Sequence, residues 1–546
     1  MGPYAPAHGL VETGQPSHRH VRLAVPRLGW TVPRTLGWAA VAVVCLALGA
    51  YLKLPEAIET PDTDTGMFAA YGQLVLHGAR PYVDFWDVHP PLVFGYWALV
   101  ESVTGPEWLR TCYTIKGLAP QSCTGSVAHG LDLLLSVTTA LFTASIARRA
   151  GGSPLVAALA AVLVVGFADQ VMLSNQGSNP SKLTLLPSTV AVWAYVRSLA
   201  SGRGVAWAAM AGLAAAVAGF AKQPALLTLL ALVGHAAWSR DRRSVVALLA
   251  GSGLVVGCVC VGLASAGSLD GFVAQAWVYN LQRTFGGYFL HPTKDTQVTL
   301  GRVLTEGAGM LAVLGALGGI VLARESRSPR QFVLLWWAAL NAVTILAFRE
   351  FAYVVPSLAI LGAFGFDRAW CWIAARGTGI GTVGCSLLLA ISLATIPPTT
   401  RFQQVQLARA RGERGPGGGL SQPEELGRIL TRDLPPGSLF VYGNAAMLYP
   451  LSGRPPATPY LNAEAFRSTA PAAERTRADL VAMLQRSLPT VIVLAPHHDE
   501  LELNLSSYQA LRSFLQGCYR RRPINRDFDH SWTVLTPTRD CTIARS

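Results

Sequence analysis

The sequence is poor in charged residues, which make up only 14% of its 546 positions, whereas 51% are hydrophobic. A soluble protein of this length cannot hide so much apolar surface in its core, so the composition excludes a soluble globular protein. Apolar runs of about 17 to 22 residues, each long enough to cross a membrane as a helix, recur between residues 35 and 397. Backbone polar groups need internal partners in lipid. The sequence therefore predicts an all-α polytopic membrane domain.

The sequence also lacks a glycine-rich phosphate loop with its lysine, which argues against direct use of nucleotides. The net charge is +13, but the basic residues lie between the apolar runs and are not gathered on one helix face. Lys and Arg accumulate in the short cytoplasmic loops of membrane proteins. We interpret the excess charge as an orientation signal and expect membrane lipids, not nucleic acid, as partners.

The basic loops alternate between the two sides when about eleven transmembrane helices are assigned. The N-terminal tail, residues 1–34, is basic and is expected in the cytoplasm. The long loops 53–126 and 266–302, and everything after residue 397, are then extracytoplasmic. This topology is that of a multi-pass protein of the plasma (inner) membrane. Helices expected from apolar length include about 35–52, 127–147, 154–170, 183–199, 244–265 and 378–396.

The segment 90–104 is apolar but short for a full crossing. Counting it as a crossing would put the later Arg-rich loops outside, against the positive-inside rule. We expect it to be interfacial or re-entrant.

The residues after the membrane domain change character. A GPGGG stretch at 415–419 lies in a predicted linker, residues 398–420, and the remainder, 421–546, alternates helical and strand patterns. SQPEELGRILTRDL and ADLVAMLQRSL are typical of amphipathic helices, and SLFVYG and PTVIVLAP of buried strands. A small extracytoplasmic α/β domain is predicted.

Few of the residues are cysteines, and two pairs fall in predicted external segments. Cys112 and Cys123 share the first loop, and Cys518 and Cys541 share the C-terminal domain. External compartments are oxidising, so a disulfide within each pair is expected. The others lie in or beside predicted helices, where a thiol is usually a small apolar filler.

The first external loop is rich in acidic side chains. It reads PDTDTGMFAAYGQLVLHGARPYVDFWDVHPPLVFGYW and contains Asp62, Asp64, Asp84, Asp87 and His89. Aspartates at the head of a helix are often only caps, so a solvated loop with caps and turns is the simpler interpretation.

This loop resembles the first external loop of the GT-C membrane glycosyltransferases. The resemblance is to the group of protein O-mannosyltransferases and lipid A aminoarabinose transferases, with their RgtA/B/C/D-like bacterial relatives. The matching positions are Asp64-Thr65-Gly66, Gly72-Gln73, Tyr82-Val83-Asp84, Trp86-Asp87 and His89-Pro90-Pro91. Thr65 replaces the family's usual Glu, and His89 replaces its usual Lys.

The resemblance continues more weakly beyond this loop. Lys222-Gln223-Pro224 is similar to a Lys-Gln turn of the family, Arg349 to an external basic residue, and residues 441–460 to the first strand region of its C-terminal domain. Near Asn179 the family often has a Glu, which this chain lacks.

The resemblance implies an inverting transfer of a sugar from a polyprenyl-phosphate carrier to an acceptor hydroxyl on a glycan, lipid or protein. Asp64 is the candidate base, with Asp62, Asp84 and Asp87 as acidic support. His89, Lys222, Arg349 and Tyr82 are the candidates for binding the donor and its phosphate. No cofactor is certain from the sequence, and a divalent metal stays open although no pattern supports one. For Lys222 and Arg349 the alternative is a snorkelling anchor.

Two other functions stay open. A transporter or lipid flippase would have charged or broken helices near the middle of the membrane and internal repeats. An inactive relative that binds polyprenyl phosphate fits the departures at Thr65 and His89. The GxGxxG match at 379–384 and the His497–Glu500 run are interpreted as helix packing and a loop.

Overall fold

The structure is a computed structural model in which two compact units are distinguished, Met1–Ala40 and Val41–Ser546. From the first unit only the start of helix α1 is described, and all contacts below lie within the second. The described residues are 34–57, 63–104, 111–113, 121–168, 179–283, 308–325, 328–348, 352–375, 383, 386, 422–443, 445–461, 471–495, 509–523, 532–538 and 541.

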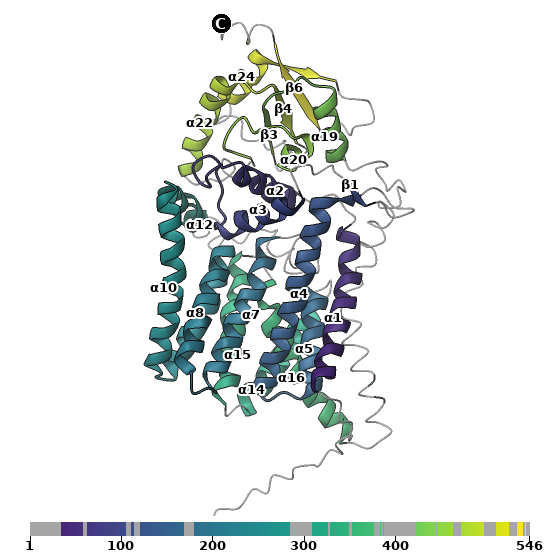
Figure 1. Cartoon of the computed structure of the whole chain (residues 1–546), viewed down its shortest axis with the longest axis vertical. Coiled ribbons are helices and arrows are strands. Elements are labelled where there is room, and N and C mark those ends of the chain that lie inside the picture. Colours follow the sequence, from purple (N-terminus) through teal and green to yellow (C-terminus); the bar gives the residue numbers. More distant parts are fainter. Residues whose placement is uncertain are drawn as a thin grey trace, which may run out of the picture. The chain divides into compact units, whose positions relative to one another are not determined.

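Long helices dominate the chain up to residue 374, and the first ten predicted spans each coincide with one (Figure 1). The predicted span 378–396 lies outside the described residues except for Val383 and Ser386. In the described part, five helices are long and apolar enough to cross a membrane: Thr35–Lys53, Val127–Arg149, Gly204–Ala221, Arg242–Ser265 and Ala352–Ile373. The long helices are α1 (Arg34–Ala57), α4 (Cys123–Arg149), α5 (Pro154–Ala168), α7 (Pro180–Ser198), α8 (Gly204–Ala221), α9 (Leu226–Trp238), α10 (Arg242–Ser265), α14 (Ala308–Glu325), α15 (Pro329–Phe348) and α16 (Val355–Ala374).

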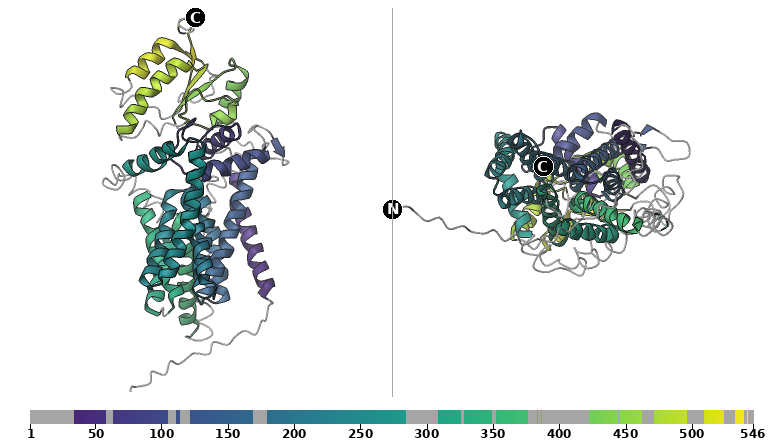
Figure 2. Two further views of the ribbon diagram at one scale, coloured as in Figure 1. Left: turned by 60° about the vertical axis from the view of Figure 1, so that its left-hand side comes forward. Right: turned by 90° about the horizontal axis from the view of Figure 1, so that it is seen from below.

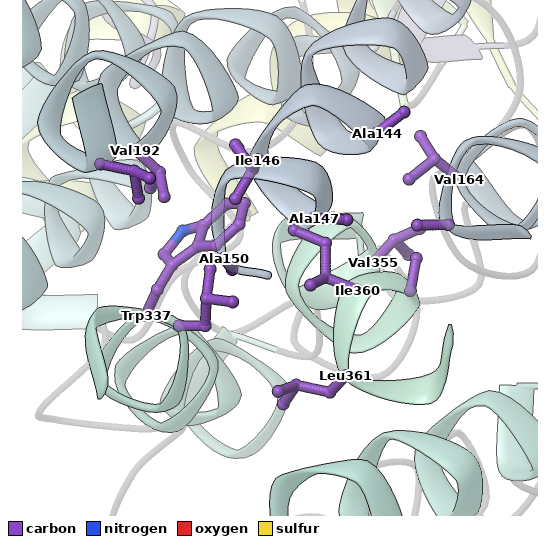
Figure 3. Packing of buried hydrophobic residues seen from close by; sticks show 14 of the residues in the cluster. Ala144, Ile146, Ala147, Ala150, Val164, Val192, Trp337, Val355, Ile360 and Leu361 are labelled. Atoms are coloured by element: carbon purple, nitrogen blue, oxygen red, sulfur yellow. The ribbon is translucent and has the colours of Figure 1, made fainter. Parts of the chain in front are cut away.

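These helices run side by side as a bundle (Figure 2). Figure 3 shows side chains from several of them gathered in one buried cluster, among them Ala147, Val164, Trp337 and Ile360. Many members of this cluster are small, and small side chains let helix backbones approach closely in membrane proteins. At Gly212, where α8 meets α10, an added Cβ would overlap the backbone of Leu248.

The first predicted external loop contains two short helices, α2 (Thr63–Leu76) and α3 (Leu92–Thr104), which pack against each other at one end of the bundle (Figure 1). A two-stranded antiparallel pair, β1 (Thr111–Tyr113) and β2 (Gln121–Ser122), precedes α4. With 13 residues, α3 is about 20 Å long, too short to cross the hydrocarbon layer.

The second predicted external loop, 266–302, is partly helical. It contains α11 (Leu269–Phe272), the π-helical turn η2 (Val273–Tyr279) and α12 (Asn280–Arg283). Single π-helical turns occur frequently at functional sites. The 3₁₀ turns η1 (Gln223–Ala225) and η4 (Ala352–Val354) precede α9 and α16.

The C-terminal residues form a four-stranded sheet in the order β3-β4-β6-β5. Strands β3 (Leu439–Tyr442) and β4 (Val491–Leu494) are the two that the sequence predicts, and they pair in parallel. Strands β5 (Tyr519–Arg522) and β6 (Thr533–Pro537) complete the sheet in antiparallel pairing. Cys518 and Cys541 are joined by a disulfide. The helices of this region are α19 (Gln422–Arg432), α20 (Leu448–Ser452), α22 (Pro471–Ser487) and α24 (Gln509–Cys518).

Gly72→Ala tests the close contact between α2 and α3. An added methyl group would lie 2.6 Å from the carbonyl carbon of Trp97, so the two helices would have to separate. Overpacking costs roughly 1–3 kcal/mol, which exceeds the gain of about 1 kcal/mol in helix propensity. We expect a lower melting midpoint for the purified protein. Gly95→Ala, in α3 with nothing within 4 Å of the added Cβ, is the matched control. Equal midpoints for the two variants would contradict the contact.

Candidate active site

Asp64 lies in the first turn of α2, and its side chain is partly exposed. The two residues that follow it in the motif are held inside the protein. Thr65 is buried, and a Cβ on Gly66 would overlap Met447, just before α20. Only glycine at position 66 permits this approach, so the motif fixes the start of α2 against the C-terminal region.

The loop between α2 and α3 carries the rest of the motif in an irregular, buried conformation. Tyr82 adopts a left-handed backbone conformation with a φ of 67°, which is uncommon for a residue other than glycine. Its hydroxyl donates a 2.6 Å hydrogen bond to the carbonyl of His89. A Cβ on Gly271 of α11 would overlap the Tyr82 backbone. Tyr82 therefore ties the beginning of this loop to its end at His89.

Side-chain amides from two other segments hold this loop. Gln275 of η2 donates to the carbonyl of Tyr82 at 2.9 Å. Asn280 of α12 and Gln223 of η1 both donate to the carbonyl of Val88, at 2.8 and 3.0 Å. A buried carbonyl without a partner costs free energy comparable to a lost hydrogen bond. Segments nearly 200 residues apart thus converge on the loop, and we call this set of three amides the amide clasp.

Asp87 and His89 form a hydrogen-bonded pair inside the clasped loop. The Asp87 side chain is only 1% exposed, and its Oδ1 accepts from the His89 backbone N–H at 2.7 Å and lies 2.6 Å from His89 Nδ1. A carboxylate only accepts, so Nδ1 carries the proton in this contact. Gln275 Oε1 in turn accepts from the Asp87 N–H at 3.2 Å. Asp87 thereby orients the His89 ring, which is 16% exposed.

Phe68 connects the His89 ring to the face of α2 that carries Asp64. The two rings meet edge to face, with centroids 4.8 Å apart. Residues four apart in a helix lie on the same face, one turn or about 5.4 Å along the axis. Asp64, four residues before Phe68, therefore lies on the same face of α2 as the ring that contacts His89. This shared face links the predicted base to the predicted phosphate-binding residue through Phe68.

Tyr71 of α2 contacts the same loop through its hydroxyl and its ring. Its hydroxyl donates to the carbonyl of Trp86 at 3.1 Å, and its ring stacks on Phe85 with centroids 4.6 Å apart. Burial, and then the negative charge of Asp87, raise the pKa of Tyr71 well above its ordinary value. Tyr71 stays protonated and acts as a donor.

The C-terminal region contacts the same loop. The backbone N–H of Trp86 donates to the carbonyl of Pro459 at 2.9 Å, and the Trp86 ring lies near those of Tyr460 and Tyr279. Pro459 and Tyr460 belong to the 441–460 segment in which the sequence resembles the family's C-terminal domain.

Lys222 lies where α8 ends, in an extended conformation with a φ of −159° that breaks the helix before η1. Its ammonium donates to Ser181 Oγ at 3.0 Å. The next residue, Gln223, is part of the amide clasp. The Lys-Gln turn and the His89 loop are therefore direct neighbours, although 133 residues separate them in the sequence.

A buried ion-pair network near Lys222 was not predicted from the sequence. Asp132 of α4 lies 3.3 Å from Lys53 of α1 and 3.9 Å from Lys182 of α7, and each side chain is at most 4% exposed. Lys182 follows Ser181, the partner of Lys222. The sequence did contain a signal for it: Asp132 lies inside the predicted span 127–147, and an acidic residue there normally has a buried partner or a function.

Of the remaining predicted catalytic and donor-binding residues, the structure describes only Asp84. Asp84 is on the surface and pairs with Arg80 at 3.1 Å. Hydrogen bonds from the Arg80 side chain and backbone lower the pKa of Asp84. Asp62 and Arg349 lie outside the described residues, as does the proposed pairing of Cys112 with Cys123. Among the described residues, no group of three His, Cys, Asp or Glu side chains is placed to hold a metal ion.

The chain is similar to known proteins in part of its sequence and in its fold. The family model for dolichyl-phosphate-mannose-protein mannosyltransferase matches residues 82–249. The structure is similar to the oligosaccharyltransferase AglB from Archaeoglobus fulgidus, with a TM-score of 0.56 at 11% identity over 93% of this chain and 77% of that one. It is also similar to ArnT from Cupriavidus metallidurans, with a TM-score of 0.51 at 15% identity over 93% and 99% of the two chains. The chain has the GT-C glycosyltransferase fold.

The resemblance predicted from the first external loop is thereby confirmed. The matched stretch starts at Tyr82 and includes the His89 loop, the Lys222-Gln223 turn and the first third of α10, whereas α2, η2 and α12 lie outside it. None of the curated protein sequences compared with this chain matches it.

Asp132→Ala tests the buried network. Removing the carboxylate that Lys53 and Lys182 share should destabilise the protein by roughly 3–5 kcal/mol, because it leaves buried cations without that partner. Melting of the purified protein in detergent measures the effect. Asp84→Ala, which breaks an exposed pair, is the control and should leave the midpoint nearly unchanged. Similar midpoints in the two variants would show that the network contributes nothing.

Proposed function

We propose that this protein is a membrane glycosyltransferase that moves a sugar from a polyprenyl-phosphate carrier to an acceptor hydroxyl on the extracytoplasmic side. One observation carries the proposal. The amide clasp sets the Asp87–His89 pair beside Lys222-Gln223 and against the face of α2 that bears Asp64. These contacts support a site in which a candidate base and two candidate phosphate-binding side chains act together.

Asp64 is the proposed general base. Its carboxylate takes the proton of the acceptor hydroxyl while the hydroxyl oxygen attacks the anomeric carbon and the bond from that carbon to the phosphate oxygen breaks. Attack from the side opposite the leaving group inverts the configuration. The partly exposed position of Asp64 at the start of α2 leaves it accessible to an acceptor.

His89 and Lys222 are proposed to bind the carrier phosphate, on which negative charge develops as the bond breaks. Charged donors aimed at such a group are among the stronger catalytic contributions. Arg349 remains a third candidate from sequence. Asp87 positions His89 and does not itself touch the substrate in this scheme.

The proposed orientation places the N-terminus in the cytoplasm and α2, α3 and the C-terminal sheet region outside. It rests on the basic loops that follow α4, α7, α9 and α14. Structures of AglB include a complex with an inhibitory peptide and a dolichol-phosphate and one with a tethered acceptor peptide. A lipid-linked donor is proposed here by analogy. A glycan, a lipid or a protein is equally compatible as the acceptor.

The Lys53–Asp132–Lys182 network bears on the rival functions, since a transporter or flippase needs charged groups near the middle of the membrane. Lys53 is four residues from the end of α1, and Lys182 lies in the first turn of α7. The network therefore gathers near one end of the bundle, beside Lys222, which favours the transferase. An inactive relative that only binds the carrier is separated from it by the Asp64 experiment.

Asp64→Asn tests the base. The change preserves size and much of the capping ability, so a structural role would survive it. We expect the rate of transfer from a labelled polyprenyl-phosphate sugar to fall at least about a hundredfold with normal melting, the usual contribution of a general base.

Asp84→Asn, in the surface pair with Arg80, and Asp62→Asn, two residues before the motif, are the controls and should keep most activity. If Asp62→Asn abolishes transfer and Asp64→Asn does not, the motif has been assigned two residues too late in the sequence. Full transfer activity in Asp64→Asn would contradict the proposed mechanism. If the wild-type protein binds the carrier but transfers no sugar, the protein is an inactive relative of the transferases.

Lys222→Met tests phosphate binding, because methionine keeps the aliphatic stem and removes the charge. We expect donor affinity to fall roughly tenfold, the value of one charged hydrogen bond, with little change in melting. Lys222→Arg keeps the cation and should retain most of the affinity. If Lys222→Met binds the labelled donor as tightly as the wild type, Lys222 is an anchor and not a ligand.

A further inference from the structure

A cluster of arginines and tryptophans lies far from the candidate active site, at the opposite end of α4. The guanidinium of Arg197 lies 4.0 Å from the ring centroid of Trp207 and 5.4 Å from that of Trp193. Arg149, the last residue of α4, lies 5.9 Å from the Trp193 ring. The two tryptophan rings meet edge to face, with centroids 5.4 Å apart. We call this set, with Arg330, the arginine cluster.

Arg330 of α15 joins this cluster through the end of α4. Its Nη1 donates to the carbonyl of Arg149 at 3.5 Å, and the neighbouring Gln331 donates to the carbonyl of Ala150 at 3.0 Å. Arg149 and Arg197 both lie against the Trp193 ring, and Arg330 contacts the Arg149 carbonyl. Three cations from α4, α7 and α15 are thus held together.

Within the described residues, none of these three arginines forms an ion pair with a carboxylate. The three guanidinium groups repel one another. Water screens this repulsion only in part, because Arg197 and Arg330 are half-buried. Orientation by the positive-inside rule requires basic loops but no converging side chains. Contact with the two indole rings holds the Arg197 side chain in a defined position.

The cluster also has the surroundings of a lipid headgroup. Tryptophans are enriched at the boundary between hydrocarbon and headgroups, and Trp193 and Trp207 belong to the apolar helices α7 and α8. The Trp193 Nε1–H donates to Ser145 Oγ at 3.1 Å, which fixes this ring. Basic pockets between membrane helices bind anionic headgroups, and arginine matches a phosphate geometrically.

We propose that Arg149, Arg197 and Arg330 form a binding site for the phosphodiester headgroup of an anionic phospholipid. The negative charge supplies the partner that the cluster lacks within the described residues. By bridging the ends of α4, α7 and α15, the lipid holds together the part of the bundle farthest from α2. The site does not depend on the proposed transferase reaction.

Native mass spectrometry of the purified full-length protein, together with melting in the same detergent, tests the site. Dioleoylphosphatidylglycerol, dioleoylphosphatidylcholine and inorganic phosphate are added separately. We expect the wild type to retain and be stabilised by phosphatidylglycerol. The triple variant Arg149→Gln/Arg197→Gln/Arg330→Gln should retain about tenfold less. Arg203→Gln, an exposed arginine between α7 and α8, is the matched control and should behave as wild type.

Three results overturn the proposal: equal retention of the two lipids by the wild type, wild-type retention by the folded triple variant, or equal stabilisation by inorganic phosphate. If the triple variant does not fold, Arg330→Gln alone decides, because Arg330 makes no cation–π contact with a tryptophan in the described part. Reduced phosphatidylglycerol retention in Arg330→Gln, with normal retention in Arg203→Gln, supports the site, and normal retention in both overturns it.

Discussion

The geometry of the candidate site depends on how the carbonyl groups of one buried loop are hydrogen-bonded. The loop between α2 and α3 has no strand or helix to pair its backbone, and a buried carbonyl without a donor is costly. Gln223, Gln275 and Asn280 supply the donors from elsewhere in the chain. The position of His89 is therefore a property of the assembled bundle, and a disturbance of η1, η2 or α12 reaches the site through these amides.

The acidic residues of the first external loop divide into distinct roles because their surroundings differ. Asp87 is buried and orients His89, whereas Asp84 is exposed and forms an ordinary surface pair with Arg80. Asp64 is partly exposed at the start of a helix whose next residues are fixed by packing. Among these three described aspartates, Asp64 alone combines access with a defined location, which is what a general base requires.

Charge is scarce in this protein, and much of what the bundle contains is gathered near its two ends. Near α2, the buried network around Asp132 leads through Lys182 and Ser181 to Lys222. At the other end, Arg149, Arg197 and Arg330 converge beside tryptophans. Between them, small and apolar side chains pack the helices closely. This distribution is typical of a membrane protein, whose charged side chains lie near the two membrane surfaces and not in the hydrocarbon layer.

The sequence by itself predicted a mostly helical membrane protein, because apolar length and backbone hydrogen bonding leave few alternatives in lipid. It also predicted two strands of the C-terminal sheet and the motif around Asp64. The amide clasp and the Asp132 network could not be predicted, because the interacting residues are 50 to 193 positions apart in the chain and no local pattern relates them. The residues before and after Tyr82 suggest a turn, but only packing against Gly271 and Gln275 selects its left-handed conformation. The tertiary structure alone decided which charges meet.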